Sequence, residues 1–376
     1  MMSFIVALIW KVFSAALLID SSKECQVYLI LSSATIRQYS AGEFNKRMQI
    51  MERRFKSVYM TFALLGLLSG TACNDYLFTG IERGELSWER IYSSDDKFYY
   101  SMTVSPTGIL YVGTNKEILR YDENGDSMIV VREDSHSGRV LSLATSKNGT
   151  IYASTLSGGM IRSSDGGQNW VEINAELEYA TVYDIDFNSA DEIFIATNIG
   201  VFTSSNDGDD WTPLTIDSTL SFVRTLAVGH DGIVFAADAF LGGVYRSTDN
   251  GASWSKVIDF RASKIAVNSE GDTFVGVGPR SPSDLIRSTD DGITWTGISP
   301  FASNHSVRAI VFDSQDDVYL MNNRGIFRSF DNGETWIAAN DGLPSTFIRT
   351  MVVSENDVFY CGVNFDGIVR GTFARQ

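Results

Sequence analysis

Short apolar runs, each containing an aromatic residue, recur along the chain after residue 100. Seven of them can be read: GILYVGT, GTIYAST, DEIFIAT, GIVFAAD, GDTFVGV, DDVYLMN and NDVFYCG, with the aromatics Tyr111, Tyr152, Phe194, Phe235, Phe274, Tyr319 and Phe359. Each run is followed by a second one, such as GMIRSS or GVYRST, and preceded by a third, such as VRTLAV from Val223. Apolar runs of this length, bounded by Gly, Asn and Asp, predict short strands joined by tight turns.

An eight-residue motif follows the second run in most units. Five copies of Ser-x-Asp/Asn-x-Gly-x-x-Trp begin at Ser163, Ser204, Ser247, Ser288 and Ser329, at spacings of 41, 43, 41 and 41 residues. Together with a strand leaving from the Trp, each unit supplies four short strands, which is the pattern of a propeller blade. Because such units bury their faces only against neighbours, seven units predict an all-β, seven-bladed β-propeller with four antiparallel strands per blade.

The two ends of the repeat region predict how the ring closes. The last unit ends at GIVRGTF without a fourth strand, whereas the first is preceded by an unpaired LSWERIY around Trp88. We expect residues 87–93 to complete the blade formed by residues 346–374, which would remove open sheet edges. The propeller is therefore predicted to span residues 87–374, after a linker over residues 74–86.

The first 73 residues read as a leader region. A basic start, an apolar stretch from Val58 to Leu68 and small residues ending at Cys73 have the layout of a secretory signal over residues 51–72. The segment resembles a bacterial lipoprotein processing site, which implies lipidation of Cys73, although Gly70 stands where that motif prefers Leu. The apolar stretch is too short to cross a hydrocarbon core of ~30 Å. Residues 1–50 are interpreted as a misassigned start.

Charge and composition limit the classes of partner. The chain carries a formal net charge of −16, and residues 74–376 hold 22 Lys and Arg against 42 Asp and Glu. Such a surface repels phosphate backbones, so no nucleic-acid partner is expected, and membrane contact is expected only through the lipid anchor. Three cysteines exclude a disulfide framework, and the three histidines lack metal-ligand spacing. We expect no cofactor and no metal.

The motif residues are interpreted as turn-builders and not as catalysts. Ser and Asp or Asn side chains accept hydrogen bonds from turn N-H groups, and Gly supplies a positive φ. The repeated Trp is expected to pack between blades. These structural positions are Asp165, Trp170, Asn206, Trp211, Asp249, Trp254, Asp290, Trp295, Asp331 and Trp336.

The motif copies and the strand pattern resemble the Asp-box, or BNR, propellers over about residues 87–374. That group includes bacterial sialidases, xyloglucanases, sortilin-type receptor domains and photosystem assembly factors; NDGLPSTFIRTMVV also resembles sensor propellers of two-component regulators. The resemblance implies the fold but not one activity. The Phe-Arg-Ile-Pro motif of sialidases is absent from residues 74–130, and sialidases have six blades.

Candidate ligand contacts lie on the face opposite the motif turns, here termed the mouth. Its connections carry the aromatics Phe98, Tyr99, Tyr179, Phe240, Phe260, Phe301 and Phe365. Aligned on the strand nearest the axis, the seven units present Tyr100, Leu141, Tyr183, Arg224, Ser263, Arg308 and Arg349. Of these ring positions, Tyr100, Tyr183, Arg224, Arg308 and Arg349 are predicted to bind an anionic group such as a carboxylate or sulfate. The alternative is that the arginines pair with neighbouring acids such as Asp184.

These observations predict an exported, lipid-anchored and non-catalytic propeller, monomeric, at the bacterial outer membrane or cell surface. It would serve as a binding platform for a protein or glycan. A glycoside hydrolase of sialidase-like type is the first alternative, for which a carboxylate pair in the mouth would be required. An extracellular sensor propeller is the second alternative.

Overall fold

The computed structural model describes residues 4–6, 15–20, 26–31, 35–39 and 86–373, except 95, 123–126, 134–137, 157–158, 179, 215–221, 241, 279–282 and 300–305. The chain divides into two compact units, Met1–Arg83 and Gly84–Gln376. The first contains one antiparallel sheet of β1 (Phe4–Val6), β2 (Ala15–Asp20), β3 (Gln26–Leu31) and β4 (Thr35–Tyr39), in that order. The predicted signal peptide and Cys73 lie outside the described residues. Within those residues, no helix has the length and hydropathy needed to cross a membrane.

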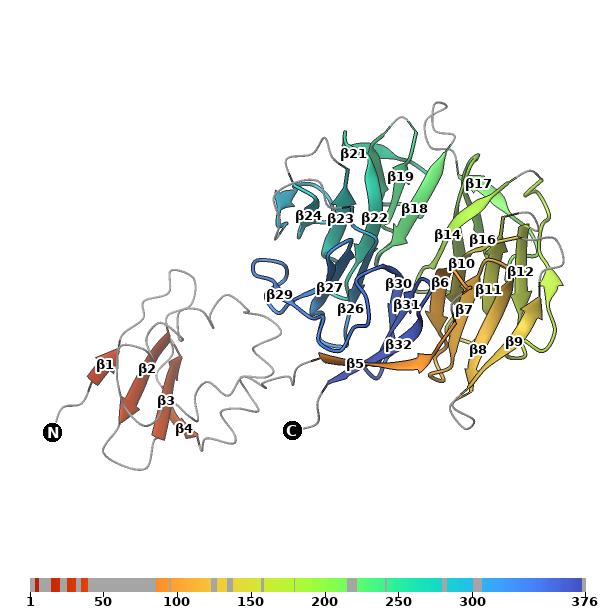
Figure 1. Ribbon diagram of the computed structural model, residues 1–376. Helices are drawn as coiled ribbons and strands as arrows, with labels where there is room; N and C mark the ends of the chain where they lie inside the picture. The colour runs from red at the N-terminus through yellow and green to blue at the C-terminus, as the bar shows by residue number, and fades with distance from the viewer. Residues whose placement is uncertain are drawn as a thin grey trace. The chain divides into compact units, whose positions relative to one another are not determined.

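Seven four-stranded antiparallel sheets make up the second unit (Figure 1), so the predicted seven-bladed propeller is confirmed. Blades 1 to 3 contain β6 (Tyr99–Val104), β7 (Leu110–Thr114), β8 (Glu117–Asp122) and β9 (Ser127–Glu133); β10 (Val140–Thr145), β11 (Ile151–Thr155), β12 (Gly159–Ser163) and β13 (Val171–Glu172); and β14 (Val182–Phe187), β15 (Ile193–Thr197), β16 (Gly200–Ser204) and β17 (Thr212–Leu214).

The remaining blades repeat this order. Blades 4 to 6 contain β18 (Val223–Val228), β19 (Val234–Asp238), β20 (Val244–Ser247) and β21 (Ser255–Ile258); β22 (Ala262–Val267), β23 (Thr273–Val277), β24 (Leu285–Ser288) and β25 (Thr296–Gly297); and β26 (Ala309–Phe312), β27 (Val318–Asn322), β28 (Gly325–Ser329) and β29 (Ile337–Ala338). Blade 7 contains β30 (Ile348–Val353), β31 (Phe359–Val363), β32 (Gly367–Phe373) and β5 (Leu86–Tyr92).

The core of the propeller lies between blades and not within them. The first strand of each blade contacts the first strand of the next, and β6 contacts both β10 and β30, which closes the ring. Seven apolar clusters fill the seven junctions between neighbouring blades. The aromatics that mark the repeat in sequence are almost wholly buried there: Tyr111, Tyr152, Phe194, Phe235, Phe274, Tyr319 and Phe359.

Ring closure follows the sequence prediction. In Figure 1, β5 (orange) lies beside β32 (blue), and the two strands pair antiparallel from Leu86 opposite Phe373 to Tyr92 opposite Ile368. Trp88 on β5 is buried, packs edge-on against Phe359 and donates its indole N-H to the Ala339 carbonyl at 2.9 Å. The N-terminal strand therefore completes the last blade and also packs on blade 6.

In blades 2 to 6, the turns between third and fourth strands are built from the repeated motif. In blade 4, Ser247 Oγ accepts a hydrogen bond from the Gly251 N-H at 2.8 Å, and Asp249 Oδ1 accepts one from the Ser253 N-H at 2.8 Å. Asn250 and Gly251 both have positive φ, 54° and 87°, which closes the turn. Hydrogen bonds from Ser253 lower the pKa of Asp249 to about 2. The serine-to-glycine bond recurs in the other four motif turns.

Candidate functional site

The two ends of each blade carry different connections. Because strands alternate in direction, the motif turns and the turns between first and second strands share one end of each blade. The turns between second and third strands, and the connections between blades, share the other end, the mouth. The ring positions predicted from the sequence lie at the start of the first strands, and therefore at the mouth.

A β-bulge presents the ring residue in six of the seven blades. In six blades the pairing register of the first strand shifts around the ring position, for example between Tyr99 and Ser101 and between Ile348 and Thr350. In blade 6, Arg308 directly precedes β26. A bulge leaves the extra residue outside the regular ladder and re-aims its side chain. The repeat therefore uses one backbone irregularity to present a ring of chemically different side chains.

Arginines and aromatics from blades 6, 7, 1 and 2 meet at the mouth. Two guanidinium groups contact the Tyr100 ring, with Arg349 Cζ 4.6 Å and Arg139 Cζ 5.4 Å from its centroid. Arg308 Cζ lies 5.8 Å from the Phe347 centroid, and its Nη1 donates to the Ile348 carbonyl at 2.8 Å. Three arginines and two aromatic rings thus form one continuous sector, here termed the cationic sector.

Tyr183 and Arg224 form a second, smaller contact. Arg224 Cζ lies 5.8 Å from the Tyr183 centroid, and Phe222 packs against the same tyrosine, with its ring centroid 5.2 Å from that of Tyr183. Tyr183 belongs to blade 3 and Arg224 to blade 4. The five predicted residues therefore form two groups: Tyr100, Arg308 and Arg349 lie in the cationic sector, and Tyr183 contacts Arg224.

The ring arginines do not pair with acids among the described residues. Arg224, Arg308 and Arg349 are exposed, and no described carboxylate lies within ion-pair distance of any of them. Asp184, the acid considered as their partner, instead binds Lys264 Nζ at 2.9 Å and the Thr225 hydroxyl at 2.8 Å. The interpretation that Asp184 neutralises the arginines is therefore wrong.

Two carboxylates of β14 bind the innermost strand of the neighbouring blade. Asp184 accepts from the Leu226 N-H at 3.3 Å, and Asp186 accepts from the Val228 N-H at 2.8 Å. Lys264 reaches Asp184 from blade 5, beyond blade 4. Burial raises the pKa of Asp186 to about 6, against the opposing effect of its backbone hydrogen bonds. These side chains join blades 3, 4 and 5 on the inner side of the ring.

The predicted loop aromatics divide into exposed and buried residues. Phe240, Phe260 and Phe365 are exposed, with Phe240 reaching 71%. Tyr99 was expected on a mouth connection, but it is the first residue of β6 and is fully buried, because it packs under Gly362 of blade 7. Tyr179 and Phe301 lie outside the described residues.

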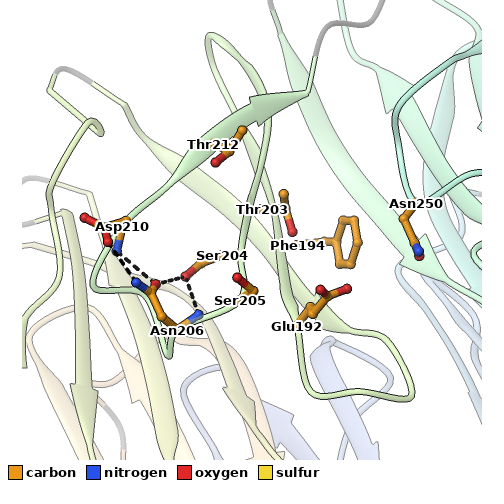
Figure 2. Close-up of a pocket in the computed structure, with 9 residues that line it drawn as sticks. All are labelled: Glu192, Phe194, Thr203, Ser204, Ser205, Asn206, Asp210, Thr212 and Asn250. Carbon is orange, nitrogen blue, oxygen red and sulfur yellow. Dashed lines mark hydrogen bonds between the residues drawn. The ribbon is translucent and has the colours of Figure 1, made fainter.

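A polar hollow of about 350 Å³ lies at the motif-turn end of blade 3 (Figure 2). Asn206 and Asp210 line one side, and Asn250 of the blade 4 turn lines the other. Asn206 already donates to Asp210 Oδ2 at 2.8 Å and accepts from the Asp210 N-H at 3.0 Å, so these groups hold the turn. His230, the histidine that the structure describes, lies exposed on the β18–β19 turn at this same end. Among described residues, no three potential ligands are placed to share a metal ion.

Solved structures share this fold. YCF48 bound to D1 peptide matches with a TM-score of 0.61 and 17% identity, over 77% of this chain and 96% of that one. Virginiamycin B lyase from Staphylococcus aureus, in a catalytically inactive form with quinupristin, matches with a TM-score of 0.66 and 14% identity, over 77% and 100%. At these identities the likeness shows the propeller fold.

A third solved structure of similar fold is an extracellular domain. The extracellular domain of the putative one component system BT4673 from B. thetaiotaomicron matches with a TM-score of 0.62 and 12% identity over 76% of this chain. The chain spans about two fifths of that structure's length. No family model matches the sequence, and no curated protein matches it.

Three residues that support the ring positions were not predicted from the sequence: Arg139, Phe222 and Phe347. Like Phe98, which was expected at the mouth, each stands two positions before a ring residue and contacts one. Side chains two positions apart in an extended strand point to the same side. Aligning this second register across the repeats would have found them.

Proposed function

We propose that the chain is an exported binding protein whose propeller mouth takes a polypeptide ligand with acidic side chains. The observation that carries this proposal is the cationic sector: Arg139, Arg308 and Arg349 carry guanidinium groups without an acidic partner among the described residues, in a chain of net charge −16. Guanidinium groups bind carboxylates through charge-assisted, often bidentate hydrogen bonds. An anionic group would be drawn to this sector within an otherwise repulsive surface.

The aromatic rings of the sector favour a polypeptide over a glycan. A sugar stacks on an open ring face, but two guanidinium groups lie against the Tyr100 ring, and Arg308 lies over Phe347. The arginine N-H groups are therefore the groups left to bind a ligand, and as donors they match carboxylates and backbone carbonyls. YCF48, which shares the fold, is the neighbour described as bound to a peptide.

The finer features of the proposal come from the sequence. We assign the motif turns to the Asp-box type, because the serine Oγ accepts a hydrogen bond from the glycine N-H in every copy. We also propose that residues 51–72 are a signal peptide and that Cys73 carries the lipid. Cys73→Ser expressed in a lipoprotein-processing bacterium should remain unacylated and leave the membrane fraction, as measured by fatty-acid labelling and fractionation. Acylation of Cys73→Ser would overturn the anchor.

A binding screen tests the mouth. The full-length chain should bind acidic peptides on an array that also carries neutral peptides and acidic oligosaccharides, and it should lose this binding in Arg308→Ala and Arg349→Ala. Arg162→Ala is the matched control, because its guanidinium lies at the motif-turn end beside Asp209. Unchanged binding in both mouth variants, or binding of oligosaccharides alone, would refute the proposal.

A further inference from the structure

The turn between β31 and β32 holds a bulky residue in a strained conformation. Phe365 has a φ of +62°, and every other described non-glycine residue with positive φ is Asp, Asn or Glu. A large side chain in this left-handed region is an outlier that costs folding free energy. Its ring is nevertheless 52% exposed, so burial does not repay the strain. Such uncompensated strain is typical of residues kept for function.

The surrounding contacts fix this turn in place. Asp366 forms an ion pair with Arg90 of β5, and the Phe365 N-H points to the Lys97 carbonyl at 3.5 Å. Gly367 lies against the Tyr92 carbonyl, where a side chain would not fit. The closing strand and the connection after it therefore hold the Phe365 ring at the mouth.

Phe365 completes an aromatic group beside the cationic sector. Its ring meets Phe98 edge-on at 4.6 Å between centroids, and Phe98 lies 6.4 Å from Tyr100, whose face Arg349 covers. Tyr100 thus joins the apolar pair of Phe98 and Phe365 to a guanidinium group, so an apolar and a cationic group lie near each other at the mouth. Ligands that meet both must carry an apolar group close to an acidic one.

We propose that Phe365, with Phe98, is a specificity subsite for an aromatic side chain that neighbours an acidic residue in the bound polypeptide. The subsite rests on the proposed function and narrows its ligand class. Arg349 would bind the carboxylate, and the exposed Phe365 ring would pack edge-on against the ligand's aromatic side chain. The strained turn is the cost of presenting that ring.

Three fluorescein-labelled decapeptides test the subsite by anisotropy with the full-length chain: GSGSEFGSGS, GSGSESGSGS and GSGSQFGSGS. The first should bind tightest. Phe365→Gly should weaken it about tenfold and leave the second unchanged, since the second carries no aromatic ring. Arg349→Ala should weaken both peptides that contain Glu. Ile293→Ala, which removes an exposed apolar side chain at the motif-turn end, is the control and should change nothing.

Stability provides a second readout that needs no ligand. Phe365→Gly and Phe365→Asn tolerate positive φ, so both should unfold at or above the parent Tm, whereas Phe98→Ala should unfold below it. A lower Tm in both Phe365 variants would show that the ring only supports the fold, and would overturn the subsite. Equal affinity for the first two peptides would also overturn it while leaving the mouth intact. No binding of any acidic peptide would instead refute the proposed function.

Discussion

Asp186 shows how one partly buried carboxylate makes stability depend on pH. Its pKa is raised from 3.8 to about 6, chiefly by burial, so the native state holds a proton that the unfolded chain has already released. Between these two values the native state binds more protons than the unfolded one, and stability falls as pH rises. The charged and titratable neighbours are Asp184 and Lys264. The contribution of Asp186 is thus fully present below pH 4 and lost above pH 6.

Asp186→Asn should remove this dependence. The amide keeps an acceptor for the Val228 N-H but carries no charge. Relative to the parent, the variant should gain on the order of 2 kcal/mol in unfolding free energy between pH 4.5 and pH 7.5. Urea unfolding at both pH values measures the difference. Parallel pH profiles for parent and variant would contradict it.

At the scale of single elements, the second strand of blades 1, 5 and 7 carries a glycine where the start of the next blade packs against it. Gly276 lies opposite Lys264, just beside the bulge of β22, and a Cβ there would come within 2.5 Å of Val307 Cβ in blade 6. Gly113 and Gly362 occupy the same position in their blades and meet Val140 and Tyr99. At these three positions a Cβ would clash with the residue at the start of the next blade.

Gly276→Ala should therefore destabilise the fold through overpacking. A loss of about 1–3 kcal/mol in unfolding free energy is expected, because Val307 belongs to a well-packed junction. Gly278→Ala is the matched control: its added Cβ would meet the Arg261 carbonyl at 3.5 Å, an ordinary contact. Chemical denaturation of both variants decides the point, and equal losses would refute the packing argument.

The elements also show what the sequence could and could not predict. Periodicity located the strands and the closing β5, because the motif recurs with its turn chemistry intact. It also placed Tyr100, Arg308 and Arg349 at one register. It misplaced Tyr99, because local sequence does not show which of Phe98, Tyr99 and Tyr100 begins the strand. Tyr99 is buried by its packing under Gly362 of blade 7, which the local sequence does not reveal. Contacts between blades, such as Arg349 with Tyr100, depend on closure of the ring and leave no trace in local sequence.

The whole ring depends on a strand that precedes it in sequence. Without β5, the outer edge of β32 would lose its partner, and the junction filled by Trp88, Phe359 and Ala339 would lose its largest side chain. The edge would then offer unpaired N-H and C=O groups to other chains. The closing strand comes from the start of the repeat region and pairs with its last blade. The seven junctions therefore depend on one another, because opening one opens the ring.

Deleting residues 74–93 should therefore collapse the fold and not trim a tail. We expect the truncated chain to aggregate or to lose its cooperative thermal transition, as measured by circular dichroism and light scattering. Restoring the strand elsewhere separates loss of closure from loss of the linker: Leu86 pairs with Phe373, so LSWERIY appended after Phe373 through a copy of the STDDGITW turn can form the same hairpin. That rearranged chain should regain the transition, because blade 7 would then have the connectivity of blades 2 to 6. A truncated chain that unfolds as cooperatively as the parent would mean that the junctions hold the ring without its closing strand.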